Sequence, residues 1–392
     1  MDIFEKAYNY STVKEAKKSG TYPYFIPLDE NEGTEVIFEG RHIIMCGSNN
    51  YLGLTTHPKV KQAAIDAIER YGTSCTGSRF LNGNMSLHER LEGELAEWVG
   101  KEAALIFSTG MQVNLGTISS IAGRGEYIIL DKDDHASIVD GAFLSGGRIE
   151  RYRHNDIDHL RRVMESLPEE SGKLLVVDGL YSMEGDIAPL PELIPICQEY
   201  GARLMVDDAH AMGVLGDGHG TAAHFMMTDD VDLIMSTFSK SFASLGGFIA
   251  GEADVVDYIK HKARSLIFSA SIPPSNTATA LAALDVMRSE PDRIARVNQI
   301  GERMREEYKK MGFNTGHSVT PVIPIIIGDD ELTFLTWRYL FERGVFVNPV
   351  ISPAVSTGRQ LLRTSYMATH TDQQLDRVLE IFHDVGKELG LI

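Results

Sequence analysis

Residues 204–210 read LMVDDAH, and this stretch decides which fold the sequence predicts. Its apolar part, Leu204–Val206, is followed at once by charged residues. A short apolar run of this kind is typical of a strand buried in a parallel sheet. Ligands of such sheets bind at the carboxyl ends of the strands, so Asp207 is a candidate functional residue. A buried carboxylate there needs a cationic partner. A protonated pyridine nitrogen, a structural ion pair and a metal ion are the alternatives.

The same pattern recurs along the chain. Short apolar runs, each followed by polar or Gly-rich residues, alternate with helical patterns. This alternation predicts an α/β fold with a mostly parallel central sheet. The predicted strands are Ala103–Phe107, Tyr127–Leu130, Leu174–Val177, Leu204–Val206, Leu233–Met235 and Phe248–Ala250.

Two helices carry clear start signals. Pro58 opens one, because its missing N–H costs little at the first helical position, and Gly72 ends it. Ser86 with Glu89 three residues later predicts a capping box at the start of the other. That second helix carries a core-facing stripe formed by Leu87, Leu91, Leu95 and Trp98.

The pattern changes after about residue 290, where a long polar helix leads into a strand at Val322–Ile327. We therefore expect three regions. Residues 1–50 form an arm that feeds the large domain, residues 51–289 form that large domain, and residues 290–392 form a smaller α+β domain.

Composition excludes several classes of protein. The 392 residues include 55 acidic and 37 basic side chains, a net charge of −18, which disfavours sequence-independent binding to nucleic acid. No apolar run approaches the roughly 18 residues that a membrane-spanning helix needs. The first residues lack the pattern of a secretion signal. Three widely spaced cysteines exclude a disulfide framework and a four-cysteine zinc site, so we expect a reducing cytoplasm.

Lys240 is the first candidate for chemistry. It follows the predicted strand Leu233–Met235 and is flanked by the hydroxyls of Ser239 and Ser241. A lysine at the carboxyl end of a strand forms an imine if its pKa is depressed, and hydroxyls suit a phosphate. A solvated surface lysine is the alternative.

Three more segments follow predicted strands. His135 follows Leu130 by a few residues and suits stacking on an aromatic cofactor, with a capping or surface histidine as the alternative. The backbone N–H groups of Ser108–Gln112, at the start of a predicted helix, suit an anion. The polar loop Asp178–Asp186 is a functional loop or a simple turn.

Other cofactor sites are disfavoured by spacing. His135, His210, Asp207 and Asp208 are metal-ligand types, but no helical His-x₃-His pair accompanies them, so we expect no metal. No Gly-x-Gly-x-x-Gly follows the first strand, which argues against a Rossmann dinucleotide site, and the Walker pattern is missing as well.

Taken together, these segments resemble the α-oxoamine synthases, a branch of the fold-type-I enzymes that depend on pyridoxal 5′-phosphate (PLP). The resemblance implies a seven-stranded, mostly parallel sheet with helices on both faces and a smaller C-terminal domain. It is carried by Asn49–Leu54, Asp134–Ser137, Ser182–Asp186, Val206–His210, Thr237–Lys240, Phe268–Pro274, Leu362–Arg363 and Ala368–Thr371.

Within that family the bacterial serine palmitoyltransferases look most similar, through Tyr22–Phe25, Gly77–Gly83 and Val347–Val355. This implies a decarboxylating condensation of an amino acid, most readily L-serine, with palmitoyl-CoA. The products would be 3-ketodihydrosphingosine, CoA and CO₂, in the first step of sphingolipid synthesis. The 2-amino-3-ketobutyrate CoA ligases, 8-amino-7-oxononanoate synthases and cysteate acyltransferases remain alternatives, as does a PLP aminotransferase, a PLP lyase or a catalytically inactive partner subunit.

The resemblance also implies roles for single residues. Lys240 would bind PLP as an imine and then remove the Cα proton, Asp207 would pair with the pyridinium nitrogen, and His135 would stack on the ring. His210 and Ser182 would lie near the phenolic oxygen. Gly110, Met111, Thr237 and Ser239 would bind the phosphate, completed by Ser269 and Ser271 of the partner in a homodimer with shared sites. Asn49 and Arg363 would hold the substrate carboxylate.

The sequence leaves the substrates open. Serine, glycine, alanine and cysteate all carry the carboxylate that Arg363 would bind. The length of the acyl chain is open, and so is its carrier, which is either CoA or an acyl carrier protein. Peripheral contact with a membrane is compatible with a lipid product.

Overall fold

The computed structural model describes residues 2–31 and 33–392. The chain divides into two compact units, which we describe separately. One unit is Asn49–Asn298, and the other combines Met1–Ser48 with Gln299–Ile392. Among the described residues, no helix is both long and apolar enough to cross a bilayer.

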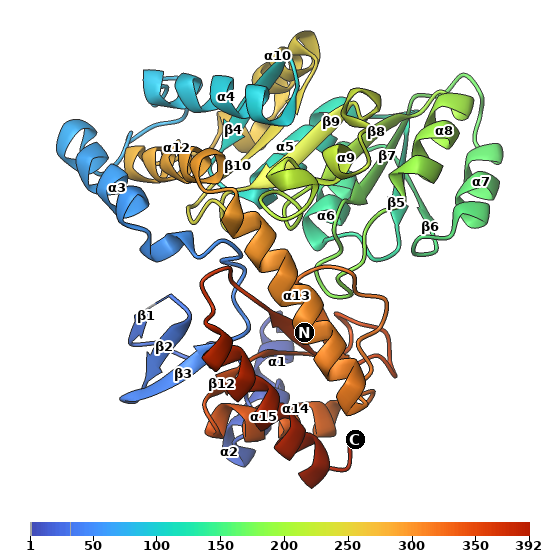
Figure 1. Cartoon of the computed structure of the whole chain (residues 1–392). Coiled ribbons are helices and arrows are strands. Elements are labelled where there is room, and N and C mark those ends of the chain that lie inside the picture. The colour runs from blue at the N-terminus through green and yellow to red at the C-terminus, as the bar shows by residue number, and fades with distance from the viewer. Residues whose placement is uncertain (1, 32) are drawn as a thin grey trace. The chain divides into compact units, whose positions relative to one another are not determined.

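The 49–298 unit is built on a seven-stranded sheet with the strand order β4-β10-β9-β8-β7-β5-β6 (Figure 1). Only β10 runs antiparallel to its neighbours, β4 and β9, and the other pairs are parallel. The predicted α/β class with a mostly parallel sheet is therefore confirmed. The strands are β4 (Ala103–Phe107), β5 (Tyr127–Asp131), β6 (Arg148–Tyr152), β7 (Lys173–Asp178), β8 (Arg203–Asp207), β9 (Leu233–Thr237) and β10 (Gly247–Gly251).

Burial on both faces explains why these strands are continuous apolar runs. Leu105, Ile128 and Met205 lie in one hydrophobic core with residues of the helices α5, α6, α10 and α11. Their neighbours in sequence, such as Ile129 and Val206, point to the opposite face and are fully buried as well. Apolar and polar residues do not alternate along these strands because neither face of the sheet meets water.

All six predicted strands are present, but the sequence analysis missed β6. Its sequence RIERY contains no apolar run, and several of its side chains are exposed or half-buried. β6 is an edge strand that pairs only with β5. An edge strand needs fewer apolar residues than a central strand, so the pattern that identified the others does not apply to it.

Both predicted helices form, but the predicted capping box is wrong. Helix α4 (Ser86–Val99) is capped by Met85, and Nδ1 of His88 accepts a hydrogen bond from the Met85 backbone N at 3.1 Å. His88 is fully buried, and its Nε2 contacts the carbonyl oxygen of Ile272 at 3.0 Å. Glu89 instead accepts from Asn84. The buried imidazole therefore takes the place expected for Glu89, one residue earlier.

The remaining helices of this unit surround the sheet (Figure 1). Helix α3 contacts α12, α4 contacts β4 and β10, α5 contacts α6, and α7 and α8 contact each other. Their bounds are α3 (Pro58–Tyr71), α5 (Gly110–Ile121), α6 (Ala136–Ser145), α7 (Ile157–Glu165), α8 (Leu190–Tyr200), α9 (Thr221–His224), α10 (Ala253–Lys262), α11 (Arg264–Ile267) and α12 (Pro274–Ser289), with α13 (Asp292–Met311) running past the unit boundary.

The other unit contains two small sheets, β1-β2-β3-β12 and β11-β14-β13. The sequence predicted residues 1–50 as an arm of the large domain, whereas the structure groups residues 1–48 with 299–392. The reason is backbone pairing: β3 runs parallel to β12, with Ile44 opposite Val345. The elements are α1 (Glu5–Tyr8), α2 (Thr12–Ser19), β1 (Glu30–Asn31), β2 (Glu35–Phe38), β3 (Arg41–Met45), β11 (Val322–Ile326), α14 (Asp330–Glu342), β12 (Val345–Phe346), β13 (Asn348–Val350), β14 (Leu361–Ser365) and α15 (Asp372–Glu388).

Candidate active site

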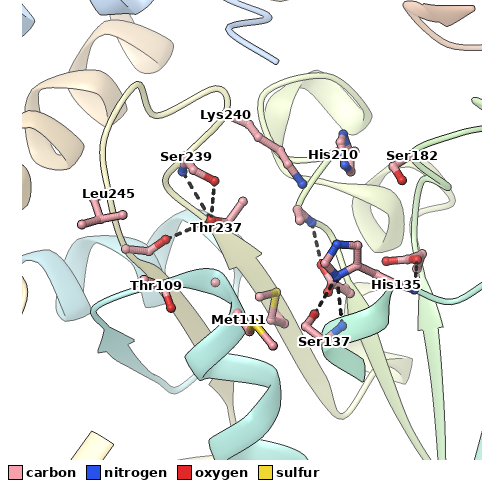
Figure 2. A pocket seen from close by; sticks show the side chains of 16 residues that line it. Thr109, Met111, His135, Ser137, Ser182, His210, Thr237, Ser239, Lys240 and Leu245 are labelled. Atoms are coloured by element: carbon pink, nitrogen blue, oxygen red, sulfur yellow. Dashed lines mark hydrogen bonds between the residues drawn. The ribbon is translucent and has the colours of Figure 1, made fainter. Parts of the chain in front are cut away.

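A cavity of about 250 Å³ lies in the 49–298 unit, at the carboxyl ends of the parallel strands (Figure 2). β7, β8 and β9 end at Asp178, Asp207 and Thr237, and all three residues line the cavity. Strand direction alone brings them to one edge of the sheet. The predicted site residues that line the cavity are Gly110, Met111, His135, Ser182, Asp207, His210, Thr237, Ser239 and Lys240.

Asp207 is one of two buried carboxylates that line the cavity, with 2% of its surface exposed. Its Oδ2 accepts a hydrogen bond from Nδ2 of Asn114 at 2.7 Å, and its Oδ1 accepts from the backbone N of Ala209 at 2.9 Å. Two donors fix the orientation of the carboxylate. An ionised carboxylate in this place favours a protonated ring nitrogen beside it.

Asn114 connects Asp207 to His135. Its Nδ2 also donates to the Ser137 hydroxyl at 2.8 Å, and that hydroxyl lies 2.7 Å from Nδ1 of His135. Nδ1 accepts from the Ser137 backbone N as well, at 3.3 Å. These contacts make Nδ1 of His135 an acceptor and fix the plane of the ring.

His135 is exposed toward the cavity, yet the protein around it still desolvates the ring. Burial lowers the pKa of His135 and outweighs the opposing effect of Asp207, while the charge of Lys240 lowers it further. The imidazole is therefore neutral near physiological pH, which suits stacking on an aromatic ring.

An anion cradle forms where β9 meets the first turn of α5. The Thr237 and Ser239 hydroxyls are 2.9 Å apart, and the Ser239 backbone N donates to Oγ1 of Thr237 at 3.3 Å. A Cβ added at Gly110 would come within 2.7 Å of Oγ1 of Thr237, so only glycine leaves this space open. Hydroxyls beside the N-terminus of a helix are suited to a phosphate.

Lys240 and His210 complete the cavity. Lys240 extends from the loop after β9 toward the middle of the cavity, near His210 and His135 (Figure 2). Nδ1 of His210 lies 2.7 Å from the hydroxyl of Tyr51, which is fully buried and donates to Oδ1 of Asn49 at 3.4 Å. An amine, a carboxylate, a flat neutral ring and an anion cradle match the aldehyde, ring nitrogen, ring face and phosphate of PLP.

Four predicted site residues do not line this cavity. Asn49 is connected to it through Tyr51 and His210. Ser269 accepts from Nε2 of Gln112 at 2.8 Å, and the Ser271 hydroxyl donates to the carbonyl of Gly83 at 2.8 Å. Arg363 lies on β14 in the other unit, with 4% of its surface exposed.

Sequence reasoning missed Asn114, Ser137, Tyr51 and Asp178 as single residues of the site. The signal for Asn114 is an amide four residues after Gly110, about one helical turn later and so on the same face of α5. Ser137 and Tyr51 stand inside quoted motifs whose functional partners only the fold reveals. In the described part of the chain, no group of three or more metal-ligand side chains is placed to hold a metal ion.

Comparison with known proteins identifies the family. A family model for class I and II aminotransferases matches residues 41–382. The chain belongs to this family. PLP is the family's cofactor, so the predicted cofactor is confirmed.

Within the class I and II aminotransferase family, the chain is similar to members of the predicted subgroup. It is 51% identical to serine palmitoyltransferase of Sphingobacterium spiritivorum over 98% of this chain and 97% of the relative. It is 39% identical to 8-amino-7-oxononanoate synthase of Thermoanaerobacter pseudethanolicus over 97% of each chain. The solved serine palmitoyltransferase of Sphingomonas wittichii superimposes with a TM-score of 0.95 at 37% identity, covering 100% of both chains. The predicted resemblance and fold type are therefore confirmed.

Proposed function

We propose that the protein is a serine palmitoyltransferase. It condenses L-serine with palmitoyl-CoA, with loss of CO₂ and release of CoA, to give 3-ketodihydrosphingosine. The observation that carries the proposal is the convergence of Lys240, Asp207 and His135 on one cavity, in a chain that is 51% identical to a serine palmitoyltransferase over 98% of its length.

The cavity residues divide the work of holding the cofactor. Asp207 would keep a proton on the ring nitrogen, and the neutral ring of His135 would pack on the face of the cofactor. When bound, PLP supplies an electron-accepting ring that stabilises negative charge at the Cα of the amino acid. Thr237, Ser239 and the N–H groups of Gly110 and Met111 bind the phosphate.

Lys240 acts as the base. Its Nζ accepts the Cα proton of serine, since its side chain extends to the middle of the cavity (Figure 2). His210, held by Tyr51, and Ser182 would bind the phenolic oxygen of the cofactor. Arg363 remains our candidate for the substrate carboxylate, because a guanidinium binds a carboxylate through two parallel hydrogen bonds, and Asn49 assists it.

We further propose a cytoplasmic homodimer. The three free cysteines, Cys46, Cys75 and Cys197, are compatible with a reducing compartment. Ser269 and Ser271 of a second copy would complete the phosphate site. The amino acid and the acyl thioester are the remaining partners.

The test is a substrate screen on the purified PLP-loaded protein. Serine, glycine, alanine and cysteate are compared by the change that each causes in the visible absorption band, and each is then combined with a series of acyl-CoAs. We expect CO₂ and free CoA thiol only with L-serine and long acyl chains. Turnover with alanine and short acyl chains would favour an 8-amino-7-oxononanoate synthase. Release of a keto acid without any thioester would contradict the acyltransferase assignment.

A further inference from the structure

His154 lies outside the cavity, between β6 and α7, and binds carboxylates of two different loops. Its Nδ1 donates to Oδ1 of Asp131 at 2.9 Å, and its Nε2 donates to Oδ2 of Asp186 at 2.8 Å. Both ring nitrogens therefore carry a proton, and the ring is a cation.

The surroundings of His154 stabilise this charge. Its side chain is 21% exposed, and those of Asp131 and Asp186 are 0% and 16% exposed. Burial alone lowers the pKa of His154, but the hydrogen bonds to the two carboxylates outweigh burial and raise it to about 10. Asn155 contacts the same two side chains: its backbone N donates to Asp131 at 2.9 Å and its Nδ2 donates to Asp186 at 3.1 Å.

The first loop, 131–135, connects His154 to His135. Asp134 accepts from the backbone N of Asp131 at 2.8 Å and from the backbone N of Asp178 at 3.0 Å. Asp178 in turn accepts from the backbone N of His135 at 2.8 Å. A continuous set of hydrogen bonds thus runs from His154 to His135, which lines the cavity.

The second loop, 181–187, connects His154 to Ser182. The backbone N of Tyr181 donates to the carbonyl of Asp186 at 3.0 Å, which closes the turn that contains Ser182. The ring of Tyr181 also packs edge-on against His154, with the ring centroids 4.5 Å apart. Figure 2 shows Ser182 and His135 on separate segments that both face the cavity.

We propose that His154 is a positioning residue that ties the 131–135 loop to the 181–187 loop and so holds His135 and Ser182 at the cofactor cavity. Without the imidazolium, Asp131 and Asp186 would face each other as like charges, with Asp133 also nearby, 3.9 Å from Nδ1 of His154. Repulsion would then separate the two loops. The kinetic consequence rests on the proposed function, whereas the effect on cofactor binding does not.

The test compares His154→Gln with Arg153→Gln in the PLP-loaded protein. Arg153→Gln is the matched control, since it breaks the neighbouring exposed ion pair to Asp156 and leaves Asp131 and Asp186 untouched. We expect His154→Gln to lower kcat per bound PLP by about ten- to a hundredfold, with a smaller change in KM for serine. We also expect weaker PLP binding and a shifted visible absorption band. The control should match the wild type in kcat, KM for serine, PLP affinity and the visible absorption band.

A second variant guards against misfolding. If His154→Gln does not fold, Asp186→Asn removes the same charged contact at nearly constant shape and should shift the same band. A folded variant with a lower melting temperature but unchanged band, PLP affinity and kcat would overturn the proposal. A wild type that binds PLP but does not use serine and palmitoyl-CoA would contradict the proposed function alone, because the band and PLP affinity would still test His154.

Discussion

His154 and His370 are two largely buried histidines, but the surroundings of His154 make its ring a cation and those of His370 leave its ring neutral. His154, in the 49–298 unit, faces Asp131 and Asp186, and its pKa rises to about 10 although burial opposes the rise. His370, in the other unit, is 2% exposed and accepts from the backbone N of Met367 at 2.9 Å. Burial lowers the pKa of His370 to about 4. The comparison teaches that carboxylate partners can outweigh burial in deciding whether a histidine is charged.

The two units also differ in the kind of side chain that they bury. The strand ends of the 49–298 unit bury the carboxylates of Asp131, Asp134, Asp178, Asp207 and Asp208. Burial raises the pKa of Asp208 to about 7, against the opposing hydrogen bonds from Thr221. The core of the other unit is an apolar cluster around α14 and α15. Desolvated charge costs stability and serves chemistry, whereas apolar burial supplies stability.

The largest expected effect is that of Lys240→Ala, in the cavity of the 49–298 unit. Removing the amine should lower kcat by more than about 10⁴-fold, because the base and the covalent anchor are lost together. Some PLP can remain bound without the covalent link. Turnover and the visible absorption band measure the effect, and turnover like that of the wild type would refute the role of Lys240.

Asp207→Asn should have the next largest effect. A neutral amide no longer keeps the ring nitrogen protonated, so removal of the Cα proton should slow by roughly 10²–10³-fold. Exchange of the serine Cα proton with deuterium from solvent, followed by NMR without acyl-CoA, isolates this step. An exchange rate equal to that of the wild type would contradict the assignment.

Leu340→Ala probes the apolar region. Leu340 is fully buried in the core that contains α14 and α15. Truncation should lower the free energy of unfolding by about 2–5 kcal/mol through lost transfer energy and the cavity left behind. Denaturant unfolding measures this loss, and kcat of the folded enzyme should stay unchanged. A strong fall in kcat without loss of stability would contradict the view that the 49–298 unit serves the chemistry and the apolar core of the other unit supplies stability.

The pH dependence contributed by His154 is the smallest expected effect for each unit of pH. A raised pKa stabilises the fold fully below the unfolded value near 6.5, and this contribution is lost as the pH rises toward about 10. Over that window the wild type should lose about 1.4 kcal/mol of stability per pH unit relative to His154→Gln. Asp131, Asp133 and Asp186 face the ring. Equal slopes for the two proteins would show that His154 is not a stabilised cation.

Much of the fold was predictable because its signals are local. The strand Ala103–Phe107 and the helix from Pro58 match the predicted bounds, since an apolar run or a capping residue acts on its own neighbours. The edge strand β6 and the cap at Met85 were missed. A half-exposed strand does not form an apolar run, and the capping His88 is positioned by Ile272, far along the chain.

The sequence alone determined which residues follow the strands, and hence that Asp207, Thr237 and Lys240 meet at one edge of the sheet. Only the tertiary structure decided how these groups are held. Asn114 reaches Asp207 across 93 residues of chain, and Tyr51 reaches His210 across 159. Such contacts depend on how helices and loops pack onto the sheet. No periodicity or turn signal in the sequence encodes a pairing between residues that distant, so the tuning of the site emerges only in the folded chain.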